Sequence, residues 1–322
     1  MFKIIPFAML NQDIVLRFLQ MKPALNHSQI EKEAGLPSKT LYKAQGGLIN
    51  LNENHLSKLL PVLRSYGYSE ELFSKAKVIS VVNHKGGVGK TTSTINIGKA
   101  LSLMGNRVLM IDIDSQGNLS QCYGIHRPVS QLIDALLDKT PLPIIEIEPK
   151  LHIVPSDIQM AYRELELVNS IGSEKRLYNK LVPYLDKYDY ILIDCPPSLN
   201  ILTTCSLVAS HECLIPIQPE ASAYHGVENL FNRIFEIREH LNYSLKVKGI
   251  FFTMVHKNQS VHRGMIDHIK EVYSHFTIFD TLIEVSTTIK QSQVAKKDLF
   301  SYSGKSGSAN QYMELTKEVI KI

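Results

Sequence analysis

The chain has 322 residues, of which 44% are hydrophobic and 20% are charged, with 17 glycines and 14 prolines. This composition excludes collagen-like, disordered and disulfide-scaffold proteins, and the four cysteines form no CxxC pair of the kind found in zinc ribbons. The net charge of +4 arises within residues 1–77, which hold ten Lys or Arg against six Asp or Glu, so we expect a separate N-terminal module with an anionic partner.

Nothing in the sequence directs the chain to a membrane. No run of about 18 apolar residues occurs, and the apolar start of the chain is followed by Asn-Gln-Asp rather than by a small-residue cleavage site. Cysteines without a pairing pattern are typical of a reducing compartment. We therefore expect a cytoplasmic protein with no membrane partner.

Residues 1–76 are expected to form a small helical module. Ser28 and Glu31 have the spacing of a capping box, which would begin one helix. Ser38 is placed to begin a second helix, and Asn52–Tyr66 has the apolar spacing of a third.

The first two of these helices, with Gly35 in the turn between them, resemble the helix-turn-helix DNA-binding family, although Glu31 stands where a small residue is usual. The resemblance implies that the second helix enters a major groove. The side chains that would face DNA are Ser38, Lys39, Thr40, Tyr42, Lys43 and Gln45. The same pattern also fits a helical domain used for protein contacts or dimerisation, and the positive charge favours DNA.

From Val78 onward, continuous apolar or β-branched runs alternate with segments of helical period. Strands that are apolar on both faces are typical of buried parallel sheets joined by helical crossovers. We therefore expect residues 77–322 to form an α/β domain with a mostly parallel, twisted sheet flanked by helices, with a linker near Gly67–Lys77. Ser301–Ser308 is predicted to be a loop, and 310–322 a packed final helix. The predicted strands are 78–83, 108–113, 151–155, 190–193, 213–217 and 247–254.

The segment His84–Thr92 reads His-Lys-Gly-Gly-Val-Gly-Lys-Thr-Thr, follows the first strand and begins a predicted helix over Lys90–Met104. This is the context of a phosphate-binding loop, because glycines let backbone N–H groups close around phosphate oxygens at a helix N-terminus. Lys90 would reach the terminal phosphates, and the Thr91 hydroxyl would hold Mg²⁺. His84 replaces the first glycine of the standard G-x-x-x-x-G-K-[ST] pattern.

The loop resembles the deviant Walker A motif of the ParA/MinD family of ATPases, Soj-like proteins included, which partition plasmids and chromosomes or place division sites. The resemblance implies a P-loop NTPase fold, ATP and Mg²⁺ as cofactors, and a homodimer that forms on ATP. Lys85 would then cross the dimer interface to the partner's nucleotide and stabilise the transferred phosphoryl group, so intrinsic hydrolysis would be slow. The loop residues expected to contact the nucleotide are Lys85, Gly86, Gly87, Val88, Gly89, Lys90, Thr91 and Thr92.

Two later segments resemble the switch regions of that family. In Asp112–Asn118, Asp114 matches the residue that orients the attacking water and supports the Mg²⁺ shell. In Tyr188–Ser198, Asp194 ends an apolar strand and matches the residue that holds Mg²⁺ through water. The candidate catalytic residues are therefore Lys85, Lys90 and Asp114, and the candidate metal-site residues are Thr91, Asp114 and Asp194.

The resemblance also assigns binding roles near the ends of later strands and close to the final helices. Family members hold adenine through loops that correspond here to Pro219, Glu220, Thr253 and Met254. The arginines that family members use to hold DNA are missing at their usual positions. Lysines that could replace them in non-specific phosphate contacts include Lys290, Lys296 and Lys297.

The resemblance covers residues 78–322 and favours an ATP-dependent DNA-partitioning protein associated with the nucleoid. Its ATP-bound dimer would hold DNA, and a centromere-binding, ParB-like partner would stimulate hydrolysis. Two alternatives stay open, namely an ATP-modulated transcriptional repressor and a MinD-like membrane-associated regulator. A reductase subunit of the iron–sulfur type is disfavoured, because the cysteines lack a cluster-bridging pattern.

Overall fold

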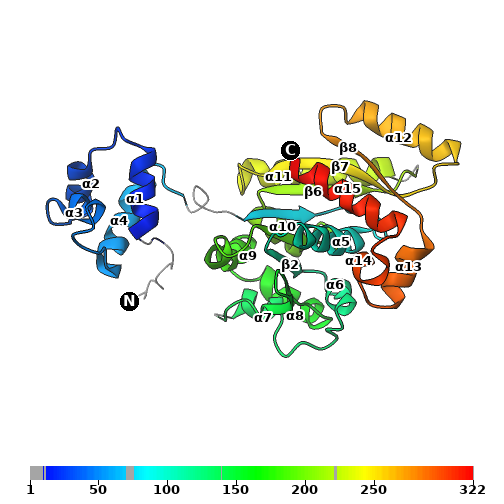
Figure 1. The fold of residues 1–322 in the computed structure, drawn as a ribbon, viewed down its shortest axis with the longest axis horizontal. Coiled ribbons are helices and arrows are strands. Elements are labelled where there is room, and N and C mark those ends of the chain that lie inside the picture. Colours follow the sequence, from blue (N-terminus) through cyan, green and yellow to red (C-terminus); the bar gives the residue numbers. More distant parts are fainter. Residues whose placement is uncertain (1–9, 11, 70–75, 139, 221–222, 322) are drawn as a thin grey trace. The chain divides into compact units, whose positions relative to one another are not determined.

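The computed structural model describes residues 10, 12–69, 76–138, 140–220 and 223–321, and the chain divides into two compact units, Met1–Ser74 and Lys75–Ile322. The first unit is helical, as the sequence predicts, and its apolar faces meet in one core built around Phe18, Ile30 and Leu41. Its helices are α1 (Gln12–Met21), α2 (His27–Glu33), α3 (Thr40–Gln45) and α4 (Glu53–Ser65) (Figure 1).

The predicted start of α2 is wrong in one detail, the residue that caps it. The N-cap of α2 is Asn26, whose Oδ1 accepts hydrogen bonds from the backbone N–H groups of Ser28 at 3.0 Å and Gln29 at 3.2 Å. Asn is as strong an N-cap as Ser, so the capping role moves two residues upstream. Glu31, the expected second member of the capping box, is buried and faces α3 instead.

The second helix, α3, also begins differently from the prediction. Its N-cap is Lys39, in the left-handed region at φ +67°, and no side-chain cap comes from Ser38. The carboxylate of Glu31 accepts the N–H groups of Lys39 at 2.9 Å and Leu41 at 2.7 Å. The buried Glu31 of α2 thus accepts two backbone N–H groups at the start of α3 that no helical carbonyl can accept. This role explains why a glutamate, and not the usual small residue, occupies position 31.

The second unit is built on an eight-stranded sheet in the order β3-β4-β2-β5-β1-β6-β7-β8. All neighbouring strands are parallel except the antiparallel pair β3 and β4 at one edge. The strands are β1 (Lys77–Val81), β2 (Val108–Asp112), β3 (Ile145–Glu148), β4 (Leu151–Val154), β5 (Tyr190–Asp194), β6 (Glu212–Ile217), β7 (Lys246–Val255) and β8 (Ile278–Glu284).

Helices cover both faces of this sheet, so successive residues of the central strands enter two different cores (Figure 1). Helices α7 (Leu132–Leu137), α8 (Gln159–Val168), α9 (Arg176–Leu181), α10 (Ile201–Ala209), α11 (Ala223–His240) and α12 (Ser260–Val272) contribute to one core. Helices α5 (Lys90–Leu103), α6 (Asn118–Cys122), α13 (Thr287–Val294), α14 (Leu299–Ser303) and α15 (Gly307–Lys321) contribute to the other. The observed fold is the helix-flanked, mostly parallel sheet that the sequence predicts.

Three details of this unit go beyond the predictions or correct them. The edge strands β3 and β8 were not predicted, because each has polar residues interleaved with its apolar ones. The predicted loop Ser301–Ser308 is confirmed only at 304–306, since α14 extends to Ser303 and α15 begins at Gly307. The packed final helix is confirmed, with Tyr312 and Leu315 fully buried. Within the described part of the chain, no helix combines the length and apolarity needed to cross a membrane.

Candidate functional site

The loop between β1 and α5 curls around the N-terminus of α5. Gly87 and Gly89 have φ angles of +75° and +85°, a region that side-chain-bearing residues rarely adopt, and Gly89 is the N-cap of the helix. A Cβ built on Gly87 would meet no atom within 4 Å, so this part of the loop borders open space. The two glycines therefore shape a backbone concavity at a helix N-terminus, the geometry that binds phosphate oxygens.

Lys90 is folded back over this loop. Its Nζ donates a hydrogen bond to the carbonyl oxygen of Lys85 at 2.9 Å, and the side chain is buried. Burial lowers the pKa of the Lys90 amine, and the nearby Asp194 carboxylate opposes that shift. The ammonium group is thus held within the loop, close to buried carboxylates, where an anionic ligand would strengthen its charged form.

A cavity of about 280 Å³, here called the loop cavity, opens over these groups. It brings together the glycine loop, the start of α5 and the segment after β2, as the sequence predicts for a shared site. Its lining residues are Gly86, Gly87, Gly89, Lys90, Thr91, Thr92, Asp114, Gln116, Asn118, Pro197, Met254 and Gln293.

Two buried aspartates lie beneath the loop cavity on adjacent strands. Asp112 on β2 and Asp194 on β5 are register partners, because parallel strands end at the same edge of the sheet. Asp194 is fully buried, and its Oδ2 has no hydrogen-bond partner among the described residues. Burial, followed by the charge of Asp112, raises the pKa of Asp194 well above its usual range, while a hydrogen bond from Thr91 opposes the shift. A carboxylate oxygen with this environment fits a hard divalent cation such as Mg²⁺.

Asp112 is also fully buried, but its oxygens are engaged within the protein. One oxygen accepts the N–H and Oγ of Ser120 at 2.8 and 2.6 Å, and the other accepts the N–H of Asp114 at 3.2 Å. Burial raises the pKa of Asp112 to about 7, against the effect of these hydrogen bonds. Asp112 therefore positions the segment that carries Asp114, whose own carboxylate accepts the N–H of Gln116 at 3.0 Å.

A second cavity of about 290 Å³, here called the flank cavity, adjoins the first and shares Gly89, Thr92, Met254 and Gln293 with it. The Thr253 hydroxyl donates to the Val88 carbonyl at 2.8 Å, which ties the end of β7 to the glycine loop. The remaining lining residues are Gln218, Thr253, His256, Ile283, Glu284, Val285, Ser286, Ile289, Lys290 and Tyr312.

The four residues expected to hold a base separate into two pairs. Thr253 and Met254 line the flank cavity, whereas Pro219 and Glu220 are not among the described residues that line either cavity. The Glu220 carboxylate instead accepts a hydrogen bond from Lys85 Nζ at 2.7 Å. Lys85 is thus paired within its own chain rather than directed at the loop cavity.

Comparison with known proteins agrees with this geometry. The family model described as an AAA domain matches residues 76–247. The sporulation initiation inhibitor protein Soj of Bacillus subtilis is 37% identical over 248 residues, which cover 76% of this chain and 98% of Soj. The chain belongs to the ParA/MinD-type ATPase family. The chromosome partitioning protein ParA of Caulobacter vibrioides is 34% identical over 76% of this chain and 94% of its own length.

A solved structure gives the same result for the fold. Cobyrinic acid a,c-diamide synthase from Mycobacterium smegmatis, determined with a bound ATP analog and magnesium, superposes with a TM-score of 0.67 at 28% identity. The match covers 76% of this chain and 95% of that protein. The family model spans residues 76–247, so it covers the glycine loop, Asp114 and Asp194 of the second unit, whereas most residues that line the flank cavity follow residue 247.

This ParA/MinD-type ATPase has site residues that motif reasoning did not identify. Gln293 on α13 lines both cavities, and its Nε2 donates to Thr92 Oγ1 at 2.8 Å. Ser120 connects the buried Asp112 to the start of α6. No sequence signal identifies Gln293, because it lies 201 positions after its contact and within no motif.

The lysines expected to bind DNA lie on α13 and in the turn after it. Lys290 lines the flank cavity. Lys296 has a left-handed backbone at φ +52°, and its Nζ lies 2.9 Å from His126 Nε2. Lys297 is exposed and follows directly. Lys296 also lines a further cavity of about 380 Å³ next to Thr91 and Thr92. We call these three lysines, on α13 and in the turn after it, the basic edge.

Five of the six residues expected to face DNA from the helical unit are exposed. Thr40 is the exception, and that expectation is wrong because Thr40 is buried and donates to the Pro37 carbonyl at 2.6 Å. Its hydroxyl fixes the turn before α3 rather than facing solvent. The exposed residues are Ser38, Lys39, Tyr42, Lys43 and Gln45.

Proposed function

We propose that this chain is an ATP-hydrolysing DNA-partitioning protein that binds Mg²⁺-ATP in the loop and flank cavities. The observation that carries the proposal is the buried Asp194 oxygen without a hydrogen-bond partner in the described part of the chain, near a buried lysine at the end of the glycine loop. A metal ion held there would neutralise phosphate charge and orient the nucleotide. The homologous synthase was solved with an ATP analog and magnesium, which supports the same ligands here.

In this proposal, different residues bind the phosphates, the metal ion, the attacking water and the base. Backbone N–H groups of the glycine loop and Lys90 hold the phosphates, while Thr91 and Asp194 hold the metal. Asp114, placed at the cavity by Asp112 and the turn to Gln116, orients the attacking water. Thr253 and Met254, at the end of β7, contact the base.

Dimerisation and slow intrinsic turnover also belong to the proposal. Two ATP-bound subunits join face to face, and Lys85 leaves Glu220 to contact the nucleotide of the partner subunit. Its charge then stabilises the transition state of phosphoryl transfer, so hydrolysis depends on the closed dimer. A ParB-like partner would accelerate this step and release the dimer from DNA.

The matched pair of variants Lys85→Ala and Glu220→Ala tests this mechanism. We expect Lys85→Ala to bind ATP with near-normal affinity but to lose turnover by roughly 100-fold, because only the transition-state contact is removed. Glu220→Ala should retain most turnover, since it releases Lys85 without removing it. Fluorescent-nucleotide binding and phosphate release measure the two properties separately. Normal turnover by Lys85→Ala would contradict the shared-site mechanism.

We propose that DNA is bound by both units of this partitioning protein. The exposed residues of α3 and its flanks would read a specific operator, and the basic edge formed by Lys290, Lys296 and Lys297 would hold DNA without sequence preference. Lys39→Ala and Lys43→Ala should weaken operator binding and reduce its salt dependence, measured by fluorescence anisotropy. Tyr243→Ala, an exposed residue of the other unit, serves as a control.

The exposed, basic α3 also favours a second function, that of an ATP-modulated repressor. Measuring operator binding by the Lys90→Ala variant distinguishes the partitioning protein from the repressor. If operator binding persists without nucleotide and the wild type does not hold non-specific DNA with ATP, the repressor function is favoured over partitioning. Loss of both activities in Lys90→Ala favours the ATP-dependent partitioning protein.

A further inference from the structure

One face of α8 is apolar and exposed, on the side opposite the core. Ile158, at the N-cap, and Tyr162, Leu165 and Val168 recur at helical spacing, and Tyr162 and Leu165 are 77% and 68% exposed. We call these four residues the α8 outer face. Met160 and Leu167 on the opposite side are fully buried. A helix with apolar residues on both sides is typical of a helix covered by a further layer of protein.

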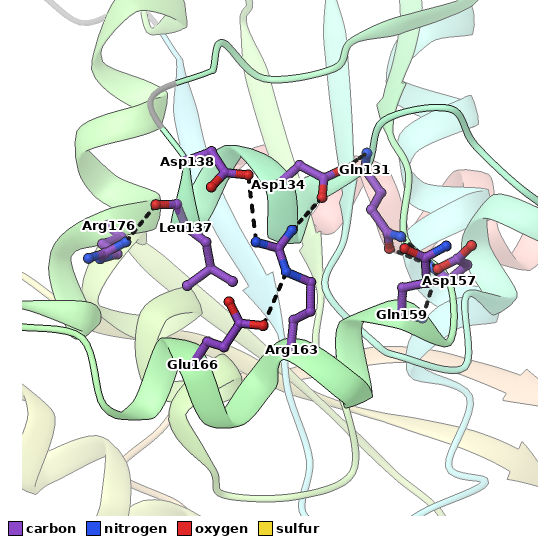
Figure 2. Close-up of polar contacts among 9 residues, drawn as sticks. All are labelled: Gln131, Asp134, Leu137, Asp138, Asp157, Gln159, Arg163, Glu166 and Arg176. Carbon is purple, nitrogen blue, oxygen red and sulfur yellow. Dashed lines mark hydrogen bonds and ion pairs between the residues drawn. The ribbon is translucent and has the colours of Figure 1, made fainter.

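The exposure of this face does not result from loose packing of α8. Figure 2 shows the guanidinium of Arg163 directed at carboxylates of α7 and of its own helix. Its nitrogens lie 2.7 Å from Asp134, 3.6 Å from Asp138 and 3.5 Å from Glu166. Helix α8 is therefore fixed to α7, and its outer face is presented in a defined orientation.

The same region is fixed at the segment before α8. The side chain of Gln131 donates to Asp157 Oδ1 at 2.7 Å and accepts the Asp157 N–H at 3.0 Å, as Figure 2 shows. Gln131 is buried. These reciprocal bonds hold the first turn of α8 against the start of α7.

Acidic groups border the outer face on both sides. On the α7 side, one guanidinium and three carboxylates give the Arg163 cluster a net formal charge of −2. On the other side, Glu164 accepts a hydrogen bond from Asn200 at 2.5 Å. Arg176 points away from the cluster to the carbonyls of Leu136 and Leu137 at the end of α7.

We propose that the α8 outer face is a docking surface for an amphipathic helix of a partner protein, with an apolar stripe bordered by lysine or arginine. The apolar stripe would cover Tyr162 and Leu165, and the basic residues would pair with the acidic borders. A second copy of this chain fits less well, because two α8 outer faces packed together would bring acidic borders against each other.

Two chains of hydrogen bonds connect the docking surface to the proposed nucleotide site. Near its N-terminus, Ser156 donates its N–H to Ser120 Oγ at 3.0 Å, and that hydroxyl donates to Asp112 at 2.6 Å. Near its middle, Glu164 accepts from Asn200, three residues after Pro197, which lines the loop cavity. Occupation of the outer face therefore constrains both segments around the cavity. This consequence for hydrolysis rests on the proposed ATPase function, whereas docking itself does not.

Peptide binding to the full chain without nucleotide tests the docking surface. The probe is a fluorescein-labelled helical peptide of about 18 residues with a leucine stripe bordered by lysines. We expect the double variant Tyr162→Gln, Leu165→Gln to bind it at least about 10-fold more weakly than the wild type, as measured by fluorescence anisotropy. Val261→Gln, at an equally exposed apolar position on α12, should bind normally. Asp138→Asn, which leaves the apolar residues intact, should weaken binding about threefold.

Three results would overturn the proposal. The first is unchanged binding by the double variant, and the second is equal affinity for a control peptide with glutamate in place of lysine. The third is a dimer of the wild type, seen by analytical ultracentrifugation without nucleotide, that the double variant loses. If the docking surface is connected to the nucleotide site, bound peptide should slow amide hydrogen exchange at 117–120. Unchanged exchange would reject this connection. Because no nucleotide is present, an inactive ATPase would not affect any of these measurements.

Discussion

Two buried carboxylates, one in each unit, differ in how their oxygens are satisfied. Glu31 in the helical unit is 3% exposed, and each of its oxygens accepts a backbone N–H, from Lys39 and from Leu41. Asp194 in the ATPase unit is fully buried, and its Oδ2 has no partner among the described residues. Burying an unsatisfied polar group is costly, so the fold alone explains Glu31, whereas Asp194 fits a ligand that would supply the missing partner, as we propose.

The difference separates structural from functional buried charge within one chain. Burial by itself does not identify a site, since both side chains are inaccessible. Asp194 differs from Glu31 in its surroundings, which include a second buried aspartate, a buried lysine and a glycine loop with left-handed backbone. Variants at these buried charges should therefore have different effects on stability and on ATP affinity.

Removal of the Lys90 ammonium should have the largest effect. We expect Lys90→Ala to lower ATP affinity by about 100-fold or more, because the other lysine of the loop, Lys85, is paired with Glu220 and does not line the loop cavity. Isothermal titration calorimetry measures this loss. Lys99→Ala is the matched control, since Lys99 lies on the same helix and is also buried but pairs with Glu148. Similar affinities in the two variants would show that the loop cavity is not the phosphate site.

Neutralisation of Asp194 should weaken nucleotide binding and stabilise the ligand-free protein at the same time. We expect Asp194→Asn to abolish the Mg²⁺-dependent part of ATP affinity, a loss of at least about 10-fold. Its free energy of unfolding without ligand should rise by about 1–2 kcal/mol, because the substitution removes the cost of burying this carboxyl, which its raised pKa reflects. Urea unfolding with and without Mg²⁺-ATP measures both effects. A lower stability of the ligand-free variant would contradict the functional explanation of the unpartnered oxygen.

Neutralisation of Glu31 should have the opposite pattern. Glu31→Gln leaves one of two backbone N–H groups facing an amide NH₂, so we expect the helical unit to lose about 1–3 kcal/mol of stability. Amide hydrogen exchange in α2–α4 should accelerate accordingly, while exchange in β1 and β5 and ATP affinity stay unchanged. An effect on ATP affinity as large as that of Lys90→Ala would remove the contrast between the two carboxylates.

Asp112 should give the smallest effect, as a pH dependence. Its pKa of about 7 in the folded chain exceeds its usual value, so the folded state binds more protons than the unfolded state between pH 4 and 7. Stability contributed by the protonated carboxyl is therefore present at low pH and is lost as pH rises through 7. Between pH 6 and 8 we expect a fall of about 1 kcal/mol in the unfolding free energy, which Asp112→Asn should largely remove. An unchanged pH slope in the variant would exclude Asp112 as its source.

Sequence motifs predicted the ATPase unit well because its site consists of contiguous segments at strand ends. A parallel sheet brings Lys90, Asp114 and Asp194 together without further information, since the carboxyl ends of neighbouring strands share one edge. The base-side prediction stays a prediction: Thr253 and Met254 line the flank cavity, while Glu220 pairs with Lys85. The pairing of Lys85 with Glu220, which lie 135 positions apart, depends on the tertiary structure and cannot be predicted from the residues around either side chain.

The other features that the sequence did not predict also depend on tertiary contacts. Gln293 reaches Thr92 only because α13 packs beside the start of α5. Glu31 was interpreted as a capping residue of its own helix, yet it caps the next one, and a local spacing rule cannot distinguish the two. The edge strands β3 and β8 have weak apolar patterns because edge strands are only partly buried.

Met254 has a consequence for ligand recognition through its left-handed backbone at φ +52°. An unbranched side chain in this conformation costs about 1–2 kcal/mol, and here it forms a wall common to the loop and flank cavities. Two fragments such as adenosine and pyrophosphate would therefore meet the same side chain from opposite sides. We expect a fragment bound in one cavity to restrict the Met254 rotamers open to a fragment in the other, so that their affinities are coupled, and we expect Met254→Gly to remove this coupling.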